Sequence, residues 1–317
     1  MKRILSLFLF FFVGLISLTS CSSKKTNIVS TCFAGYDFAN HVAGDLKTSS
    51  MLLNPGEELH DYSPSISDVE RIISSELFIY IGGESDEEWV EKQILPEIDS
   101  SHTKVINMMD IVKSKGNAYN EEDPESADVE EEAEEDEEFD EHVWNSITNA
   151  KLIVSEIANA LSLIDSDNKD TYEKNRDSYL EELNNLDLNI KNVLKNKKTN
   201  LLVFADRFPL LYFVKEYDLE YDAAFKGCES AKEANPKTIE GLVKKVVDNH
   251  INVIFTIELS ESNIASTVKT ECEKKGIEVS IRTFYTMHNV SKEDYQNKIS
   301  YVDFMKKNIE SLEIALS

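Results

Sequence analysis

Short apolar runs alternate with helix-like segments over the first third of the chain. The runs have the length and composition of strands, which we expect at 27–33, 50–53, 77–81 and 104–109. The segments between them predict helices at 36–46, from Ser67 onward and at 87–98. Ser67 and Glu70 have the spacing of a capping box, which favours a helix start at Ser67. Strands separated by helices predict a mostly parallel sheet.

The same alternation returns over the last third of the chain. We expect strands at 201–204, 221–225, 253–257 and 279–284. Helices are expected at 210–216, 236–250, 261–275 and 295–316. This pattern predicts a second sheet of mostly parallel strands with helices on its faces.

Two long helices are predicted between these halves, at 144–164 and 168–196. The second is highly charged except for an apolar stripe that includes Tyr179, Leu183 and Leu186, as a rigid spine between two lobes would be. We therefore expect an α/β fold of two β/α lobes with mostly parallel sheets, joined by a long rigid spine helix. The N-terminal lobe is placed at 25–165, the linking helix at 166–198 and the C-terminal lobe at 199–317. A ligand cleft is expected between the lobes, beyond the carboxyl ends of the strands.

The first twenty residues are expected to be an export signal. Lys2 and Arg3 precede an apolar run over 4–18, and small residues follow it. The run is shorter than the roughly 20 residues that favour a membrane span. Its Leu-Thr-Ser-Cys ending resembles a bacterial lipobox, which implies that residues 1–20 are removed and that Cys21 is lipidated. We therefore expect an extracytoplasmic protein anchored by lipid to the cell membrane; an ordinary secretory signal with an incidental cysteine is the alternative.

Negative charge is concentrated in one segment. The net charge is −26, and 15 of the 59 acidic residues lie within 121–141. Such a surface repels phosphate backbones, so we expect no nucleic-acid partner. We predict that 117–141 is a disordered acidic insert in the N-terminal lobe, because like charges repel one another. The alternative is an antenna of carboxylate oxygens that concentrates divalent cations near the cleft.

The cysteines do not form a disulfide scaffold, because four in 317 residues are too few. If Cys21 is lipidated, the odd number that remains leaves at least one thiol unpaired. Cys228 and Cys272 lie in the same half of the chain and could pair with each other.

The sequence contains none of the common enzyme signatures GxSxG, GxxxxGK[ST], GxGxxG and HExxH. Its carboxylates are scattered or lie in the acidic run, so no general-acid pair stands out. We therefore expect a protein without catalytic activity.

Three of the six histidines are candidates for binding, and two of them, His60 and His142, lie in loops that lead into helices, where binding residues tend to occur. His60 follows a predicted strand, His142 follows the acidic run, and His288 follows the last predicted strand. Neutral imidazoles from separate loops can assemble a site for a first-row metal ion. The other three, His41, His102 and His250, are assigned to structure or surface.

Several segments resemble the metal-binding lipoproteins of ABC importers for zinc and manganese. The two most specific are PGEELHDYSPSISDV around His60 and DEHVWNSITNAKLIVSEIANAL around His142. The stretches ADRFPLLYFVKEYDL and GCESAKEANPKTI are also similar, and the resemblance covers about the whole mature chain. It implies a non-enzymatic receptor that captures a divalent cation between two lobes and delivers it to an ABC permease in the membrane. We expect this receptor to be a monomer.

The resemblance also implies a set of metal ligands. His60 and His142 correspond to the first and second histidines of that family. The third ligand normally follows the first strand of the second lobe, where this chain has Ala205, Asp206 and Arg207. We expect Asp206 as the third ligand and His288 as the fourth, with Glu258 in reserve. A carboxylate satisfied by backbone donors is the alternative role for Glu258.

Three imidazoles and a carboxylate suit Zn²⁺ in four-coordinate geometry, whereas more oxygen donors would suit Mn²⁺. We therefore expect zinc as the transported ligand, with manganese as the second choice. A surface adhesin or interaction lipoprotein is the alternative from another class of protein. An exported metallohydrolase is a third option, and no motif supports it.

Overall fold

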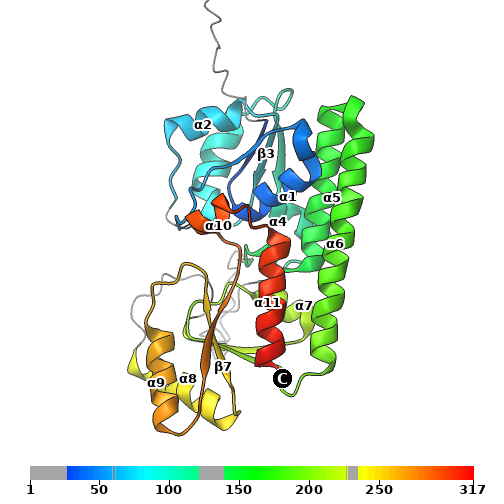
Figure 1. The fold of residues 1–317 in the computed structure, drawn as a ribbon. Helices are drawn as coiled ribbons and strands as arrows, with labels where there is room; N and C mark the ends of the chain where they lie inside the picture. Colours follow the sequence, from blue (N-terminus) through cyan, green and yellow to red (C-terminus); the bar gives the residue numbers. More distant parts are fainter. Residues whose placement is uncertain (1–26, 59, 61, 121–138, 226, 228–234) are drawn as a thin grey trace, which may run out of the picture.

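A computed structural model describes residues 27–58, 60, 62–120, 139–225, 227 and 235–317 of the chain. The expected signal peptide and Cys21 lie outside these residues, as do Cys228 and most of the expected acidic insert. Figure 1 shows two sheets, one above the other, with long helices running along one side.

The N-terminal sheet has four parallel strands in the order β2-β1-β3-β4. The strands are β1 (Ile28–Ser30), β2 (Ser49–Met51), β3 (Leu77–Tyr80) and β4 (Lys104–Asn107). Alternate side chains of β3 enter different cores, because successive residues of a strand face opposite sides of the sheet. Helix α2 (Ile66–Ile73) and the π-helix Glu87–Ile94 cover one face, while α1 (Phe33–Ala43) and α4 (Met108–Lys113) belong to the core of the other.

The C-terminal sheet repeats this plan, with parallel strands in the order β6-β5-β7-β8. The strands are β5 (Leu201–Phe204), β6 (Glu220–Ala223), β7 (Val253–Ile257) and β8 (Ser280–Phe284). Helices α8 (Pro236–Asp248) and α9 (Ile264–Lys274) form a core with one face. Helices α7 (Leu211–Tyr217) and α11 (Tyr301–Ala315) pack on the other face. The expected α/β fold with two mostly parallel sheets is therefore present.

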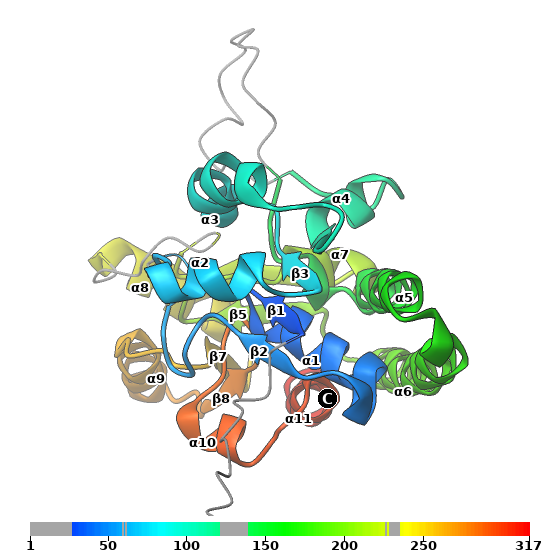
Figure 2. The same ribbon diagram turned by 90° about the horizontal axis from the view of Figure 1, so that it is seen from above.

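Two long helices, α5 (Ile147–Ile164) and α6 (Lys169–Lys195), lie side by side at one edge of the molecule (Figures 1 and 2). Helix α6 has 27 residues, which at 1.5 Å per residue gives a length of about 40 Å, and it runs past both sheets. Tyr179 of α6 packs against Phe38 of α1, and Tyr217 of α7 donates to Asp187 of α6. One hydrophobic core continues through both halves, so α6 is a packed spine.

Helix α5 is long and apolar enough to cross a membrane by length and composition. Half of it is buried inside the fold, against α6 and α1. These contacts are those of a core helix in a globular protein.

Several element boundaries differ from the sequence-based expectation. Helix α2 is capped by Ser65 and Asp68 rather than by Ser67 and Glu70. The expected final helix at 295–316 is divided into α10 (Lys292–Gln296) and α11. The spine is three residues shorter at each end than 166–198, with a 3-10 turn over Ser166–Asn168 before it. Helix α4 was not expected at all.

The expected insert at 117–141 has structured ends. Asn120 pairs with Phe139 in an antiparallel bridge, and the Asp140 amide donates to the Tyr119 carbonyl. Asp140 and Glu141 are buried. The prediction of disorder is wrong for 117–120 and 139–141, because these residues pack against the fold; 121–138 lie outside the described residues.

Cys32 and Cys272 are buried, free thiols. The expected possibility of a Cys228–Cys272 disulfide finds no support at Cys272, and Cys228 lies outside the described residues.

Candidate metal site

Three histidines from distant parts of the sequence meet between the two sheets. His60 lies in the loop after β2, His142 directly precedes the 3-10 turn Val143–Asn145, and His288 lies in the loop after β8. One ring nitrogen of each lies within 4.8 Å of those of the other two. The site thus forms where loops leave the carboxyl ends of parallel strands, as expected for an α/β fold.

The spacing of the three nitrogens is close to that of a metal site. A tetrahedral Zn²⁺ with Zn–N bonds of about 2.0–2.1 Å holds its nitrogens roughly 3.4 Å apart. The rings of His142 and His288 already have centroids 4.3 Å apart, and those of His60 and His288 are 5.3 Å apart. The centroids of His60 and His142 are 6.2 Å apart, and because no nitrogen pair is more than 4.8 Å apart, each pair would have to approach by at most about 1.4 Å to reach the zinc spacing.

His142 has one ring nitrogen engaged by a carboxylate. Its Nδ1 lies 2.9 Å from Asp140 Oδ1, and both side chains are buried. An ionised carboxylate only accepts hydrogen bonds, so Nδ1 carries the proton and Nε2 keeps its lone pair. Metal-binding histidines are commonly oriented in this way. Asp140 belongs by sequence to the expected acidic insert and lies two residues before His142.

The surroundings of His60 and His288 favour the neutral imidazole. Burial lowers the pKa of His60, and this outweighs the opposing charge of Glu141. Burial, followed by the neighbouring His142 and His60, holds the pKa of His288 well below its usual range. Because only a neutral imidazole has a lone pair to donate, these conditions favour metal binding near neutral pH.

Asp206 is turned toward the backbone of its own lobe. It is only 1% exposed, and its Oδ1 accepts from the Arg207 amide at 2.9 Å while Oδ2 accepts from the Ile257 amide at 3.3 Å. Among the described residues it is not part of the three-histidine group. The Arg207 side chain donates to Glu58 Oε2 at 2.9 Å, which joins the two lobes beside the histidines.

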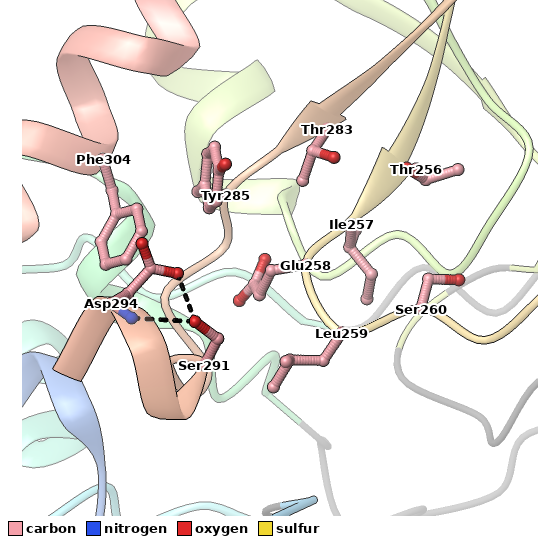
Figure 3. A pocket seen from close by; sticks show the side chains of 10 residues that line it. All are labelled: Thr256, Ile257, Glu258, Leu259, Ser260, Thr283, Tyr285, Ser291, Asp294 and Phe304. Carbon is pink, nitrogen blue, oxygen red and sulfur yellow. Dashed lines mark hydrogen bonds between the residues drawn. The ribbon is translucent and has the colours of Figure 1, made fainter. Parts of the chain in front are cut away.

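Glu258, the reserve ligand, anchors the loop that carries His288. Its Oε2 accepts from the Thr286 amide at 2.7 Å, and its Oε1 accepts from the Thr286 hydroxyl and from the His288 amide. Burial raises the pKa of this carboxyl group. Glu258 lines a pocket of about 270 Å³ between the end of β7 and α10. Figure 3 shows the lining side chains, among which Asp294 accepts from Ser291. These contacts match a carboxylate satisfied by donors of the protein.

The other three histidines lie outside the cluster. His41 stacks on Tyr179 at a centroid distance of 4.1 Å. His102 is exposed, with Nε2 3.4 Å from the Ser74 carbonyl. His250 is exposed beyond the end of α8 and has a positive φ of 52°.

Hydrogen bonds between the lobes surround the site. Trp144 Nε1 donates to the Thr286 carbonyl at 2.9 Å, and Asn289 Nδ2 donates to the Asn54 carbonyl at 2.8 Å. The first bond fixes the His142 segment against the His288 segment, and the second fixes the loop that leads to His60 against the His288 segment. Sequence patterns could not identify them, because each joins residues more than 140 positions apart.

A family model described as "Zinc-uptake complex component A periplasmic" (ZnuA) matches residues 28–315. The zinc-binding lipoprotein AdcA of Streptococcus pneumoniae is 30% identical over 301 residues, which are 93% of this chain and 58% of that protein. This chain thus spans little more than half of that relative. ZnuA of Bacillus subtilis, a high-affinity zinc uptake system protein, is 26% identical over 94% of this chain and 90% of its own length. The manganese ABC transporter substrate-binding lipoprotein ScaA of Streptococcus gordonii is 27% identical over 99% of this chain and 98% of its own length.

Solved structures show the same fold. The Zn(II)-bound ZnuA-like domain of S. pneumoniae AdcA superposes with a TM-score of 0.71 at 28% identity, covering 92% of this chain and 99% of that domain. The metal-dependent lipoprotein YcdH of B. subtilis superposes with a TM-score of 0.73 at 26% identity, and the match covers 92% of this chain and 100% of YcdH. Since the family match extends over nearly all of the described residues, this chain belongs to the ZnuA family of solute-binding transport components.

Proposed function

We propose that this protein captures one divalent cation, zinc first, and delivers it to the permease of an ABC importer. The observation that carries the proposal is the meeting of His60, His142 and His288, whose ring nitrogens lie within 4.8 Å of one another. The role is that of a receptor and not of an enzyme: the ion is held between two lobes and passed on unchanged. Relatives named as zinc-binding lipoproteins and zinc uptake proteins support the choice of cargo.

The donor atoms favour zinc over manganese. Three neutral imidazoles suit Zn²⁺, and for the same ligands Zn²⁺ binds more tightly than Mn²⁺. Manganese remains the second candidate, because a relative of similar length is named as a manganese-binding protein. Titrating the same preparation with both ions decides between them: zinc is expected to bind more tightly, and tighter binding of manganese would reverse the assignment.

The test of the site is metal analysis and zinc titration of the untagged mature protein. We expect one tightly bound zinc per chain. His60→Ala, His142→Ala and His288→Ala are each expected to weaken zinc by more than about 100-fold, since changes behind the ligands already cost about 10- to 100-fold. His102→Ala is the matched control and should bind like the wild type. Unchanged affinity in all three site variants would contradict the receptor assignment.

Asp206 stays the candidate for a fourth protein ligand. If it ligates the ion, Asp206→Asn weakens zinc as strongly as a histidine variant. If it serves the Arg207 and Ile257 amides alone, the same change lowers the free energy of unfolding by about 1–3 kcal/mol and leaves the zinc affinity near the wild-type value. Measuring both quantities on one preparation separates the two roles.

We propose that the mature protein begins at a lipidated Cys21, works outside the cytoplasm as a monomer and reaches the membrane through its lipid alone. The residues 1–21 support this by their basic, apolar and small-residue order ending in cysteine. Cys21→Ser is expected to move the protein from the membrane fraction to the soluble extracytoplasmic fraction. Retention of the variant in the membrane would contradict anchoring through Cys21.

A further inference from the structure

His60 is the most exposed of the three clustered histidines and depends on two neighbours for its orientation. Its Nδ1 lies 2.7 Å from Ser85 Oγ and 3.3 Å from Glu141 Oε1. Ser85 in turn donates its hydroxyl to Glu141 Oε1 at 2.6 Å and its amide to Glu141 Oε2 at 3.1 Å. Glu141 is only 6% exposed. The three side chains form a closed set of contacts on the side of His60 that holds Nδ1.

The hydrogen-bond directions determine which nitrogen of His60 carries the proton. A serine hydroxyl has one proton, and an ionised carboxylate only accepts. Because the Ser85 proton is directed to Glu141, the Ser85 oxygen can only accept from His60. Nδ1 must therefore be the protonated nitrogen of the neutral ring, and Nε2 carries the lone pair. This is the tautomer that a metal bound at Nε2 requires.

We propose that Ser85 and Glu141 are positioning residues for metal capture: they hold His60 in the tautomer and orientation that present Nε2 to the ion. The inference rests on the proposed function and deepens it. Neither residue touches the cation; both act through His60.

Charge balance supports the same role for Glu141. A zinc ion brings two positive charges to three neutral imidazoles, and an uncompensated charge is costly to bury. Asp140 and Glu141 are both buried, and each contacts the Nδ1 of one histidine. Two carboxylates directly behind the ligands offset the two charges of a divalent cation, so the site suits a dication better than a monovalent one.

The glycine at position 83 leaves space for the Glu141 side chain. At Gly83, an added Cβ would lie 2.4 Å from Glu141 Cβ and 2.5 Å from Glu141 Oε2, closer than atoms can approach. Trp89 Nε1 donates to the Ser85 carbonyl at 3.0 Å and holds the turn that presents the serine. A side chain at position 83 would displace the carboxylate from Ser85 and His60.

Zinc affinity of the mature protein, measured by competition with a chelator, tests the proposal. Ser85→Ala and Glu141→Gln are each expected to weaken zinc by about 10- to 100-fold. The double variant should lose less than the product of the single losses, because both changes act on the same histidine. Ser85→Thr keeps the hydroxyl and should bind within a few-fold of the wild type. Glu84→Gln, an exposed acid on the same turn, is the charge control.

The ¹⁵N chemical shifts of the His60 imidazole distinguish positioning from a merely structural role. We expect a protonated Nδ1 in the wild type and a mixture of tautomers in Ser85→Ala. A protonated Nε2 in the wild type, or wild-type zinc affinity in both Ser85→Ala and Glu141→Gln, would overturn the inference. If His60→Ala and His142→Ala also bind zinc like the wild type, the proposed function itself has failed; if they lose zinc, only the positioning role is wrong.

Discussion

Asp37 connects three helices through a single buried carboxylate. Its Oδ2 accepts from the Tyr179 hydroxyl of α6 at 3.1 Å and from the Tyr301 amide of α11 at 3.2 Å. His41, one turn further along α1, lies with Nδ1 2.8 Å from the Asp37 carbonyl and 3.3 Å from Oδ2. The first lobe, the spine and the last helix are thus joined at one point, away from the metal site.

This contact predicts a pH dependence of stability. Burial by itself lowers the pKa of His41. The hydrogen bonds and charge of Asp37 more than reverse this effect and raise the pKa from 6.5 to about 8. A raised folded-state pKa stabilises the fold when the ring is protonated, so the contribution is complete below about pH 6.5 and is lost as the pH rises through about 8. The contribution of His41 to the free energy of unfolding is at most about 2 kcal/mol.

Urea denaturation at pH 6 and pH 9 measures this contribution. The loss of unfolding free energy between the two pH values should be smaller in His41→Gln than in the wild type, whereas His102→Gln should lose as much as the wild type. An identical loss in His41→Gln would show that the His41–Asp37 contact does not cause the dependence.

At the scale of elements, the start of α2 shows how two local signals compete. Ser65 and Asp68 have the capping-box spacing, and so do Ser67 and Glu70. The structure uses the first: Ser65 Oγ accepts from the Asp68 amide, and Asp68 Oδ2 accepts from the Ser65 amide. The tertiary fold selects one of two starts that the local pattern leaves open.

If Ser65 caps α2, replacing Ser65 should cost more stability than replacing Ser67. Ser65→Ala should lower the free energy of unfolding by about 1 kcal/mol, because the Asp68 amide at the helix start loses its acceptor. Ser67→Ala should cost less than about 0.5 kcal/mol, as is usual for surface changes. Denaturant midpoints of both variants decide the matter, and a larger cost at Ser67 would place the cap where the sequence pattern first suggested it.

Other elements show where sequence patterns succeed and fail. The spans 201–204 and 253–257 match β5 and β7, because continuous apolar runs between polar turns leave little choice of boundary. The last helix was expected in one piece, but Lys298 has a positive φ of 55° and Ser300 caps a new helix. Helix α4 was missed because it follows β4 directly, with Asn107 as its cap.

At the scale of the whole molecule, the packed spine restricts the relative motion of the lobes. The core formed with α6 continues through both halves, and hydrogen bonds such as Trp144–Thr286 join the lobes at the site. Each pair of histidine nitrogens has to approach by at most about 1.4 Å to share one ion. We therefore expect zinc to cause a small rotation of the second lobe and no wide hinge opening.

Solution scattering with and without zinc measures this motion. The radius of gyration, about 20 Å for a compact chain of this length, should change by less than about a tenth. A larger change would show that the lobes open despite the spine.

The acidic segment can be tested apart from the site. Asn120 and Phe139 pair with each other, so their ends are adjacent and a short Gly-Ser linker can replace 121–138. Tight zinc binding should survive this replacement within a few-fold, because Asp140 and Glu141 are retained. A large loss of affinity would mean that the segment contributes to the primary site. A deletion extended through Asp140 should weaken zinc, since Asp140 contacts His142.

The order of apolar runs and helical segments was enough to predict two parallel β/α lobes and a spine, because strand and helix periods are local properties of the chain. It also directed attention to His60, His142 and His288, since loops at the carboxyl ends of parallel strands gather at one place. The tertiary structure alone decided that Asp206 faces its own backbone and that Asp140, Ser85 and Glu141 support the histidines. Side-chain direction in a loop depends on partners that are distant in sequence, such as Ser85 and Glu141 at 56 positions apart, and no local pattern records such partners.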